Sequence, residues 1–341
     1  MKQRYLELDA IRGIAALMVV FFHYTVRYGQ IYGYSVKPFF TFELGKYGVQ
    51  LFFIVSGFVI FLTLDKTTYA VDFIVSRFSR LYPTYWAAVI LTFCVVHLFH
   101  LTGREVSFCH ALINLTMFQR WFNVSNVDGV YWTLAVELSF YLIMYVLFIT
   151  KQIKRIDIVI VFWLFLIFLT HFLEVNKAVH IPIIVKSLLL LDYGNLFIAG
   201  IIFYKIKHKT NIFNCLILLI SLLAEFYLHG KLVWLVAGYF FVFYLFSRGR
   251  LNFLSIKPLI YLGNISYSLY LIHQNIGYVV IRNLDAHDLM NSVSVVIVPL
   301  AVSIVIAGLM QAYIEQPALK LIRSKWAQCF IRDSLLEKAL N

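Results

Sequence analysis

Long apolar segments alternate with short polar segments along nearly the whole chain. A helix needs about 20 predominantly apolar residues to cross the hydrocarbon core of a bilayer, which is about 30 Å thick. Such segments predict transmembrane helices at residues 10–28, 47–64, 82–101, 130–149, 156–172, 187–205, 212–228, 232–247, 260–281 and 292–314. We therefore expect an all-α polytopic membrane protein, a bundle of about ten transmembrane helices.

The composition agrees with a chain embedded in a membrane. Of its 341 residues, 62% are hydrophobic and only 13% are charged, whereas soluble domains carry about 25% charged residues. The net charge of +12 is spread over short loops rather than gathered on one face, so we expect membrane lipids and no nucleic acid among the partners. We expect one membrane domain at residues 1–320 and a basic, amphipathic cytoplasmic tail at residues 321–341.

The distribution of basic residues predicts the orientation. Loops on the cytoplasmic side of a membrane are enriched in Lys and Arg. If the N-terminus lies inside, the inner segments hold 19 of the 29 Lys and Arg residues and the outer segments hold 9, with Arg12 remaining. We therefore expect both termini to be cytoplasmic and the first helix to be retained as an uncleaved anchor.

The first predicted helix carries an arginine and a histidine, Arg12 and His23. Eleven positions along a helix amount to roughly 20° beyond three full turns and about 16 Å of rise, so both residues fall on one face. Charged residues in membrane helices usually face a bundle interior or a wet cavity. The alternative is an arginine that reaches the membrane surface and a histidine that merely packs in the core.

Two further segments place polar groups beside this helix. Ser56 and Gly57 lie near the middle of the second predicted helix, where they would form either a close helix contact or a gap for a thin substrate arm. Arg77 and Arg80 lie one turn apart near the inner surface. They could hold a phosphate by two hydrogen bonds each, or could simply anchor anionic lipid.

Glu137 is the carboxylate of the fourth predicted helix, about two turns below the outer surface. By depth it falls near His23, and a carboxylate beside an imidazole fixes its tautomer and supports general-base catalysis. A structural Glu bonded to a Trp or Tyr is the alternative. The four cysteines are scattered and no His lies at metal-binding spacing, so we expect no metal site.

These positions belong to six blocks of sequence: LDAIRGIAALMVVFFH, GVQLFFIVSGF, SRFSRLYPTYW, DGVYWTLAVELSFYL, GNISYSLYLIH and YIEQPALK. In this order the blocks resemble the motifs of the membrane-bound acyltransferase family 3, bacterial proteins that O-acylate cell-surface carbohydrates. The resemblance covers nearly the whole chain. Its most specific elements are the spacing of Arg12 and His23, the Ser-Gly-Phe block, and Trp132 followed by Glu137.

The resemblance implies a multi-pass protein of the bacterial inner membrane that transfers an acyl group from acyl-CoA, commonly acetyl-CoA, to a carbohydrate hydroxyl. The donor is a substrate, and no permanently bound cofactor is expected. The acceptor would be a lipid-linked or surface carbohydrate such as O-antigen or exopolysaccharide. The catalytic candidates are His23 and Glu137, and the candidates for donor binding are Arg12, Arg77, Arg80 and Ser56. A saccharide transporter or flippase without acyl-transfer chemistry is the alternative.

The charge asymmetry generates a topology prediction. Cysteine labelling should find both termini on the cytoplasmic side, because the basic segments resist translocation. The measurement uses a membrane-impermeant thiol reagent on intact cells and, as a control, on opened membranes. Labelling of a cysteine beyond Lys325 from outside intact cells would show that the orientation is wrong.

Overall fold

The computed structural model describes residues 4–230 and 233–340, with side chains of the last helix described as far as Cys329. The described residues contain helices and loops and no strand, which confirms the all-α class. The ten predicted segments coincide with helices, although residue 232, the expected start of the eighth, lies outside the described residues. The long helices are α1 (Leu6–Phe22), α3 (Gly48–Leu64), α4 (Ala70–Leu98), α6 (Trp132–Ile149), α7 (Ile156–Val175), α9 (Gly194–His208), α10 (Ile212–His229), α11 (Val233–Ser247), α12 (Lys257–Ala286), α13 (Ser294–Met310) and α14 (Gln316–Leu340).

Short elements connect or extend these helices. A π-helical segment, η1, continues α1 without a break into a short α2, and a second π-helical segment, η7, joins α13 to α14. The short elements used below are η1 (His23–Arg27), α2 (Tyr28–Tyr32), η2 (Glu43–Tyr47), α5 (Phe108–Asn114), η3 (Gly129–Tyr131), α8 (Ile183–Leu189) and η7 (Gln311–Glu315).

Seven helical segments within the described residues are long and apolar enough to cross a membrane. The predicted spans outside this set fall on α1, α11 and α12. The α-helical part of α1 has 17 residues and α11 has 15, whereas α12 has 30 but carries many polar side chains. The chain is thus a multi-pass membrane protein by its helices, and the total of ten crossings stays a prediction.

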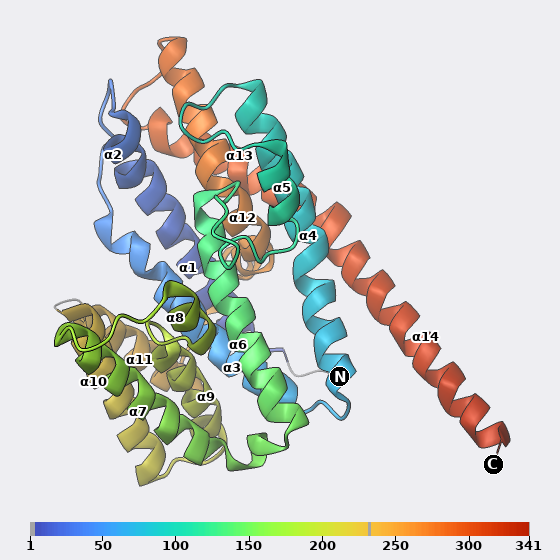
Figure 1. The fold of residues 1–341 in the computed structure, drawn as a ribbon. Coiled ribbons are helices and arrows are strands. Elements are labelled where there is room, and N and C mark those ends of the chain that lie inside the picture. The colour runs from blue at the N-terminus through green and yellow to red at the C-terminus, as the bar shows by residue number, and fades with distance from the viewer. Residues whose placement is uncertain (1–3, 231–232, 341) are drawn as a thin grey trace.

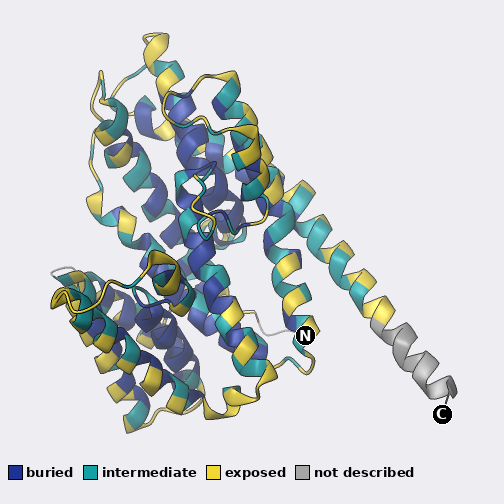
Figure 2. Ribbon diagram, viewed as in Figure 1, coloured by how far each residue is buried: buried dark blue, intermediate teal, exposed yellow. Residues whose placement is uncertain are grey.

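The most polar of the long helices in the core, α12, lies at the centre of one half of the bundle (Figure 1). It packs against α1 on one side and α13 on another, and its middle, residues 263–281, is almost entirely buried, whereas both ends carry exposed residues (Figure 2). Its buried polar residues include Ser266, His273 and Asn275. By contrast α7 and α10 expose many apolar side chains, as expected of helices that face lipid. The bundle therefore places its polar helix inside and its apolar helices outside.

A buried carboxylate ties together the other half of the bundle. Glu225 of α10 is 1% exposed. It accepts hydrogen bonds of 2.7 Å from both Gln50 Nε2 of α3 and Asn195 Nδ2 of α9, and His229 Nδ1 lies 3.2 Å from it. An unpaired carboxylate in this position would be costly, so these contacts hold the three helices in one arrangement.

The last helix departs from the predicted organisation. The predicted tenth span ends at residue 314, but the helix continues through η7 into α14. Pro317 lies at the start of α14, directly after the π-helical turn, where irregular hydrogen bonding accommodates a residue that has no N–H. In α14, Trp326 Nε1 donates a 2.7 Å hydrogen bond to Asp72 Oδ1 of α4. The described part of the predicted tail thus extends the last helix and packs on α4, and its place at the membrane surface stays a prediction.

The contact between α3 and α9 explains Gly57. A Cβ at Gly57 would collide with the backbone of Phe197, and one at Gly200 would collide with the carbonyl of Ile54. The two helices therefore approach through glycine on both sides, in the manner of small-residue contacts between membrane helices. Of the two interpretations of Gly57, the structure supports the close helix contact, because α9 fills the space where a substrate arm would lie.

This contact predicts how much an added methyl group lowers the free energy of unfolding. Gly200→Ala should lower the free energy of unfolding by about 1–3 kcal/mol, the usual cost of overpacking, because the obstructing atoms are backbone. Thermal unfolding of the detergent-solubilised protein measures it. Gly238→Ala is the matched control, since a Cβ at Gly238 of α11 meets nothing within 4 Å. Equal stability of the two variants would contradict the packing described.

Candidate functional site

A second pair of helices, α1 and α12, also meets at glycines, and this contact positions the residues of the site. A Cβ at Gly13 of α1 would lie 2.7 Å from the backbone nitrogen of Gly263 of α12, and a Cβ at Gly263 would meet the backbone of Asp9. The backbones of α1 and α12 are therefore nearly in contact. As a result, the polar residues of α12 lie beside Arg12 of α1 and beside His23, the first residue of the η1 segment that continues α1.

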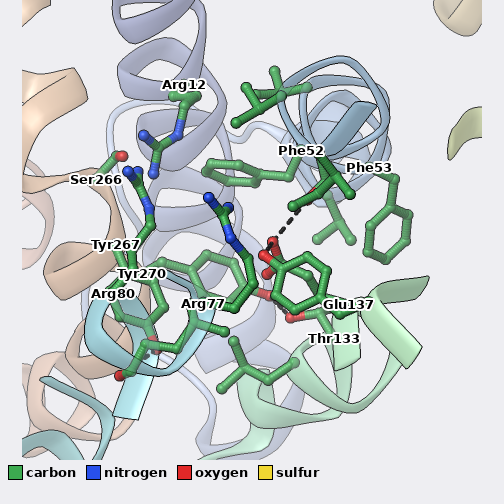
Figure 3. A pocket seen from close by; sticks show the side chains of 18 residues that line it. Arg12, Phe52, Phe53, Arg77, Arg80, Thr133, Glu137, Ser266, Tyr267 and Tyr270 are labelled. Atoms are coloured by element: carbon green, nitrogen blue, oxygen red, sulfur yellow. Dashed lines mark hydrogen bonds between the residues drawn. The ribbon is translucent and has the colours of Figure 1, made fainter. Parts of the chain in front are cut away.

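The first cavity, which we term the arginine cavity, lies between α1, α3, α4, α6 and α12 and has a volume of about 90 Å³. Figure 3 shows the guanidinium groups of Arg12, Arg77 and Arg80 directed into a common space. Ser56 and Glu137 lie on its wall. The structure thus brings together all four residues predicted to bind the donor, from the three helices α1, α3 and α4.

The charges in this cavity are unevenly balanced. Within the described chain, Arg12, Arg77 and Arg80 form no ion pair with a carboxylate. Glu137 instead accepts a 2.7 Å hydrogen bond from Ser56 Oγ and a second from the Tyr141 hydroxyl. Three cations around one space with a single carboxylate on the wall favour the binding of a polyanion.

A fourth arginine extends the cluster from α14. Arg323 Nη2 donates a 3.2 Å hydrogen bond to Ser76 Oγ, and Arg323 Nε lies 3.4 Å from Ser79 Oγ. It influences Arg77 and Arg80 electrostatically. The sequence assigned Arg323 only to the basic tail, because nothing in the pattern indicates that α14 packs against α4.

The second cavity, which we term the histidine cavity, has a volume of about 310 Å³. Val49 and Tyr270 line both cavities, so the two meet at these side chains. The Tyr270 hydroxyl forms a 2.9 Å hydrogen bond with Thr133 Oγ1, which fixes the ring at the junction. The histidine cavity is lined by Val19, Phe22, His23, Arg27, Lys46, Val49, Arg104, Gly129, Val130, Trp132, Tyr270 and Gln274.

His23 is the first residue of η1 and contacts a second histidine, His273 of α12. His273 Nδ1 lies 2.8 Å from the Tyr270 carbonyl oxygen, which can only accept, so in the neutral ring this nitrogen carries the proton and Nε2 carries a lone pair. His273 Nε2 lies 3.1 Å from His23 Nδ1, which is also 2.8 Å from the Val19 carbonyl oxygen.

These contacts determine the tautomer of His23. Both neighbours of its Nδ1 are acceptors, so Nδ1 carries the proton and Nε2 is the nitrogen with the free lone pair. Nε2 forms no hydrogen bond within the described chain, and the ring lines the histidine cavity. The arrangement can therefore take a proton from a group held in that cavity.

The structure does not bring Glu137 to His23. Glu137 faces the arginine cavity, whereas His23 faces the histidine cavity. The sequence placed the two residues at a similar depth, but a depth along the helix does not specify the rotation of that helix. The partner of His23 is His273, the last residue of the block GNISYSLYLIH. Its spacing from Tyr270 and Ser266 on one helical face was the available signal.

Comparison with known protein families identifies the family of this chain. The family model for acyltransferase 3, described as an acyltransferase domain, matches residues 5–308. The matched range contains both cavities and ends before α14. No curated protein and no solved structure matches the chain.

Proposed function

This chain belongs to the acyltransferase 3 family, and we propose that it transfers an acyl group, acetyl in the simplest case, from acyl-CoA to a hydroxyl of a cell-surface carbohydrate. The observation that carries the proposal is the junction of the two cavities at Val49 and Tyr270. One cavity offers cations to a polyanionic donor, and the other offers a basic nitrogen to an acceptor. A saccharide transporter or flippase would need no such pair, and the family match weighs against it.

The proposal assigns the arginine cavity to the donor. CoA carries several phosphate charges, which Arg12, Arg77 and Arg80 can hold by charge-assisted hydrogen bonds. A volume of about 90 Å³ suits part of the donor rather than the whole nucleotide, so the adenosine end would remain outside. The thin pantetheine arm would then run past Ser56 towards Val49 and present the thioester at the junction.

The chemical step then needs only one proton acceptor. His23 Nε2 takes the proton of the acceptor hydroxyl while the hydroxyl oxygen attacks the thioester carbonyl carbon. The C–S bond breaks, and the CoA sulfur leaves with the electron pair and receives the proton. The same nitrogen could instead take the acyl group first; trapping of an acyl-histidine after rapid mixing with acyl-CoA alone distinguishes the two routes. His273 acts as a positioning residue that keeps Nδ1 of His23 protonated.

Glu137 takes a different role from the one predicted. It holds Ser56 Oγ at 2.7 Å and adds a negative charge to a strongly positive cavity. We assign it to the shape and charge of the donor cavity rather than to direct support of His23. The protein would lie in the inner membrane of a bacterium, with the arginine cavity at the cytoplasmic end and the histidine cavity towards the outer end.

The donor site predicts a specific loss of affinity. Arg80→Ala should weaken acyl-CoA binding by about 1.5–3 kcal/mol, the value of a hydrogen bond to a charged group. Arg80→Lys should restore only part of it, because an ammonium lacks the planar fork of a guanidinium. Isothermal titration with acetyl-CoA in nanodiscs measures this. Arg155→Ala, an exposed basic residue at the same end, is the control, and an unchanged affinity in Arg80→Ala would count against the site.

The histidine pair predicts loss of turnover without loss of donor binding. His23→Gln should lower kcat by 10²–10⁴-fold, the usual contribution of general-base catalysis, because an amide cannot take up a proton. His273→Leu should lower kcat with unchanged donor affinity, and His273→Gln should retain more activity because its carbonyl oxygen can accept from His23 Nδ1. The measurement is transfer of labelled acetyl to surface carbohydrate.

The control for this pair is His97→Gln. His97 Nδ1 lies 2.8 Å from the carbonyl oxygen of Phe93 one turn earlier, as His23 does from that of Val19, but His97 lines neither cavity. Its variant should transfer normally. Near-normal transfer by His23→Gln, with expression confirmed by immunoblot, would remove His23 from the mechanism.

A further inference from the structure

The histidine cavity is as strongly cationic as the arginine cavity, although the reaction gives no evident reason for this. Arg27, Lys46 and Arg104 all line it, and no Asp or Glu does. They come from three separate segments, η1, η2 and the loop after α4. Convergence of three such segments on one cavity is a property of the fold rather than of local composition.

The three cations lack acidic partners within the described chain. None of them takes part in an ion pair. Arg27 Nη1 donates a 3.0 Å hydrogen bond to Gln30 Oε1, whereas Lys46 and Arg104 lie over the ring faces of Tyr47 and Tyr278, at 5.1 and 5.8 Å from the centroids.

The carboxylate that acts on Arg104 electrostatically is Asp128. Both of its oxygens are already used. Oδ1 accepts a 3.1 Å hydrogen bond from the backbone N–H of Val130, and Oδ2 accepts a 3.0 Å one from that of Asn275. Asp128 therefore caps the start of η3 and binds a backbone N–H within α12, and among the described residues it forms no ion pair with Arg104.

The predicted topology makes these charges more unusual. The segments expected outside hold few basic residues, as membrane proteins generally require, yet three of those residues meet in this one cavity. A volume of about 310 Å³ lies within the range of small-molecule sites, about 300–1,000 Å³. The cavity is thus large enough for a sugar residue together with a charged substituent.

We propose that the acceptor is an anionic carbohydrate, and that Arg27, Lys46 and Arg104 bind a carboxylate or phosphate group close to the hydroxyl that His23 deprotonates. This rests on the proposed acyl transfer and specifies its acceptor class. The anion is either an acidic group on the sugar or the phosphate of a lipid carrier. Both present the oxygens that Lys and Arg bind by charge-assisted hydrogen bonds, and Gln274 on the same wall can bond a neighbouring hydroxyl.

The test uses unacylated carbohydrate purified from a strain that lacks this protein. Three forms are compared: the intact lipid-linked material, material released from the lipid by mild acid, and material whose carboxyl groups have been reduced to alcohols. Transfer of labelled acetyl from acetyl-CoA is measured in proteoliposomes against acceptor concentration. Loss of transfer on carboxyl reduction identifies a sugar acid, and loss on release identifies the carrier phosphate.

Variants of the cations complete the test. Lys46→Gln and Arg104→Gln should each raise the KM for the acceptor about tenfold or more and leave the KM for acetyl-CoA unchanged, because each removes a charge-assisted contact at the acceptor only. Lys37→Gln, an exposed lysine that does not line the cavity, is the matched control and should behave as wild type.

Two failures are distinguishable. Equal transfer by the wild type to the intact, released and carboxyl-reduced forms, with normal acceptor KM in both variants, would overturn the anionic acceptor while leaving acyl transfer intact. Absence of transfer by the wild type to all three forms, in protein that binds acetyl-CoA, would overturn the proposed function and this inference with it.

Discussion

The close contact between α1 and α12 is the feature on which both cavities depend. At Gly13 and Gly263 the two helices leave no room for a Cβ, and further along, the ring of Tyr24 packs against Gly277 while its hydroxyl donates a 2.8 Å hydrogen bond to the His273 carbonyl oxygen. Polar groups in a membrane-embedded bundle are costly where they meet lipid. The contact between α1 and α12 places many of these polar groups between two facing helices, and the histidine pair is a consequence of that contact.

The same constraint explains why the cavities lie end to end. α1 carries Arg12 near its start, and His23 follows directly after its end, so one helix contributes to both. Tyr270 of α12, bonded to Thr133 of α6, lines both spaces. A thioester held by its phosphates in one cavity and a hydroxyl held in the other would meet at this point. The geometry therefore suits a reaction whose two substrates approach from opposite ends of the bundle.

Much of this arrangement could be predicted from the sequence, because the governing signals are local. The lengths of the apolar segments predicted the positions of the helices. Isolated polar residues within or beside those segments predicted residues that line the cavities: Arg12, His23, Ser56, Arg77 and Arg80. What could not be predicted depends on helix rotation and long-range packing. The predicted depth of Glu137 did not specify the direction of its side chain, which depends on the rotation of α6. His273 reaches His23 only because α12 packs against α1. Arg323 reaches Ser76 only because α14 packs against α4.

The most direct test of the two-cavity account is a cryo-EM structure of the protein in nanodiscs with a non-hydrolysable thioether analogue of acetyl-CoA. The account predicts phosphate density beside Arg12, Arg77 and Arg80, and an acyl carbon at the junction of Val49 and Tyr270, facing His23 Nε2. An analogue bound elsewhere, or one whose acyl end lies away from the histidine cavity, would contradict it.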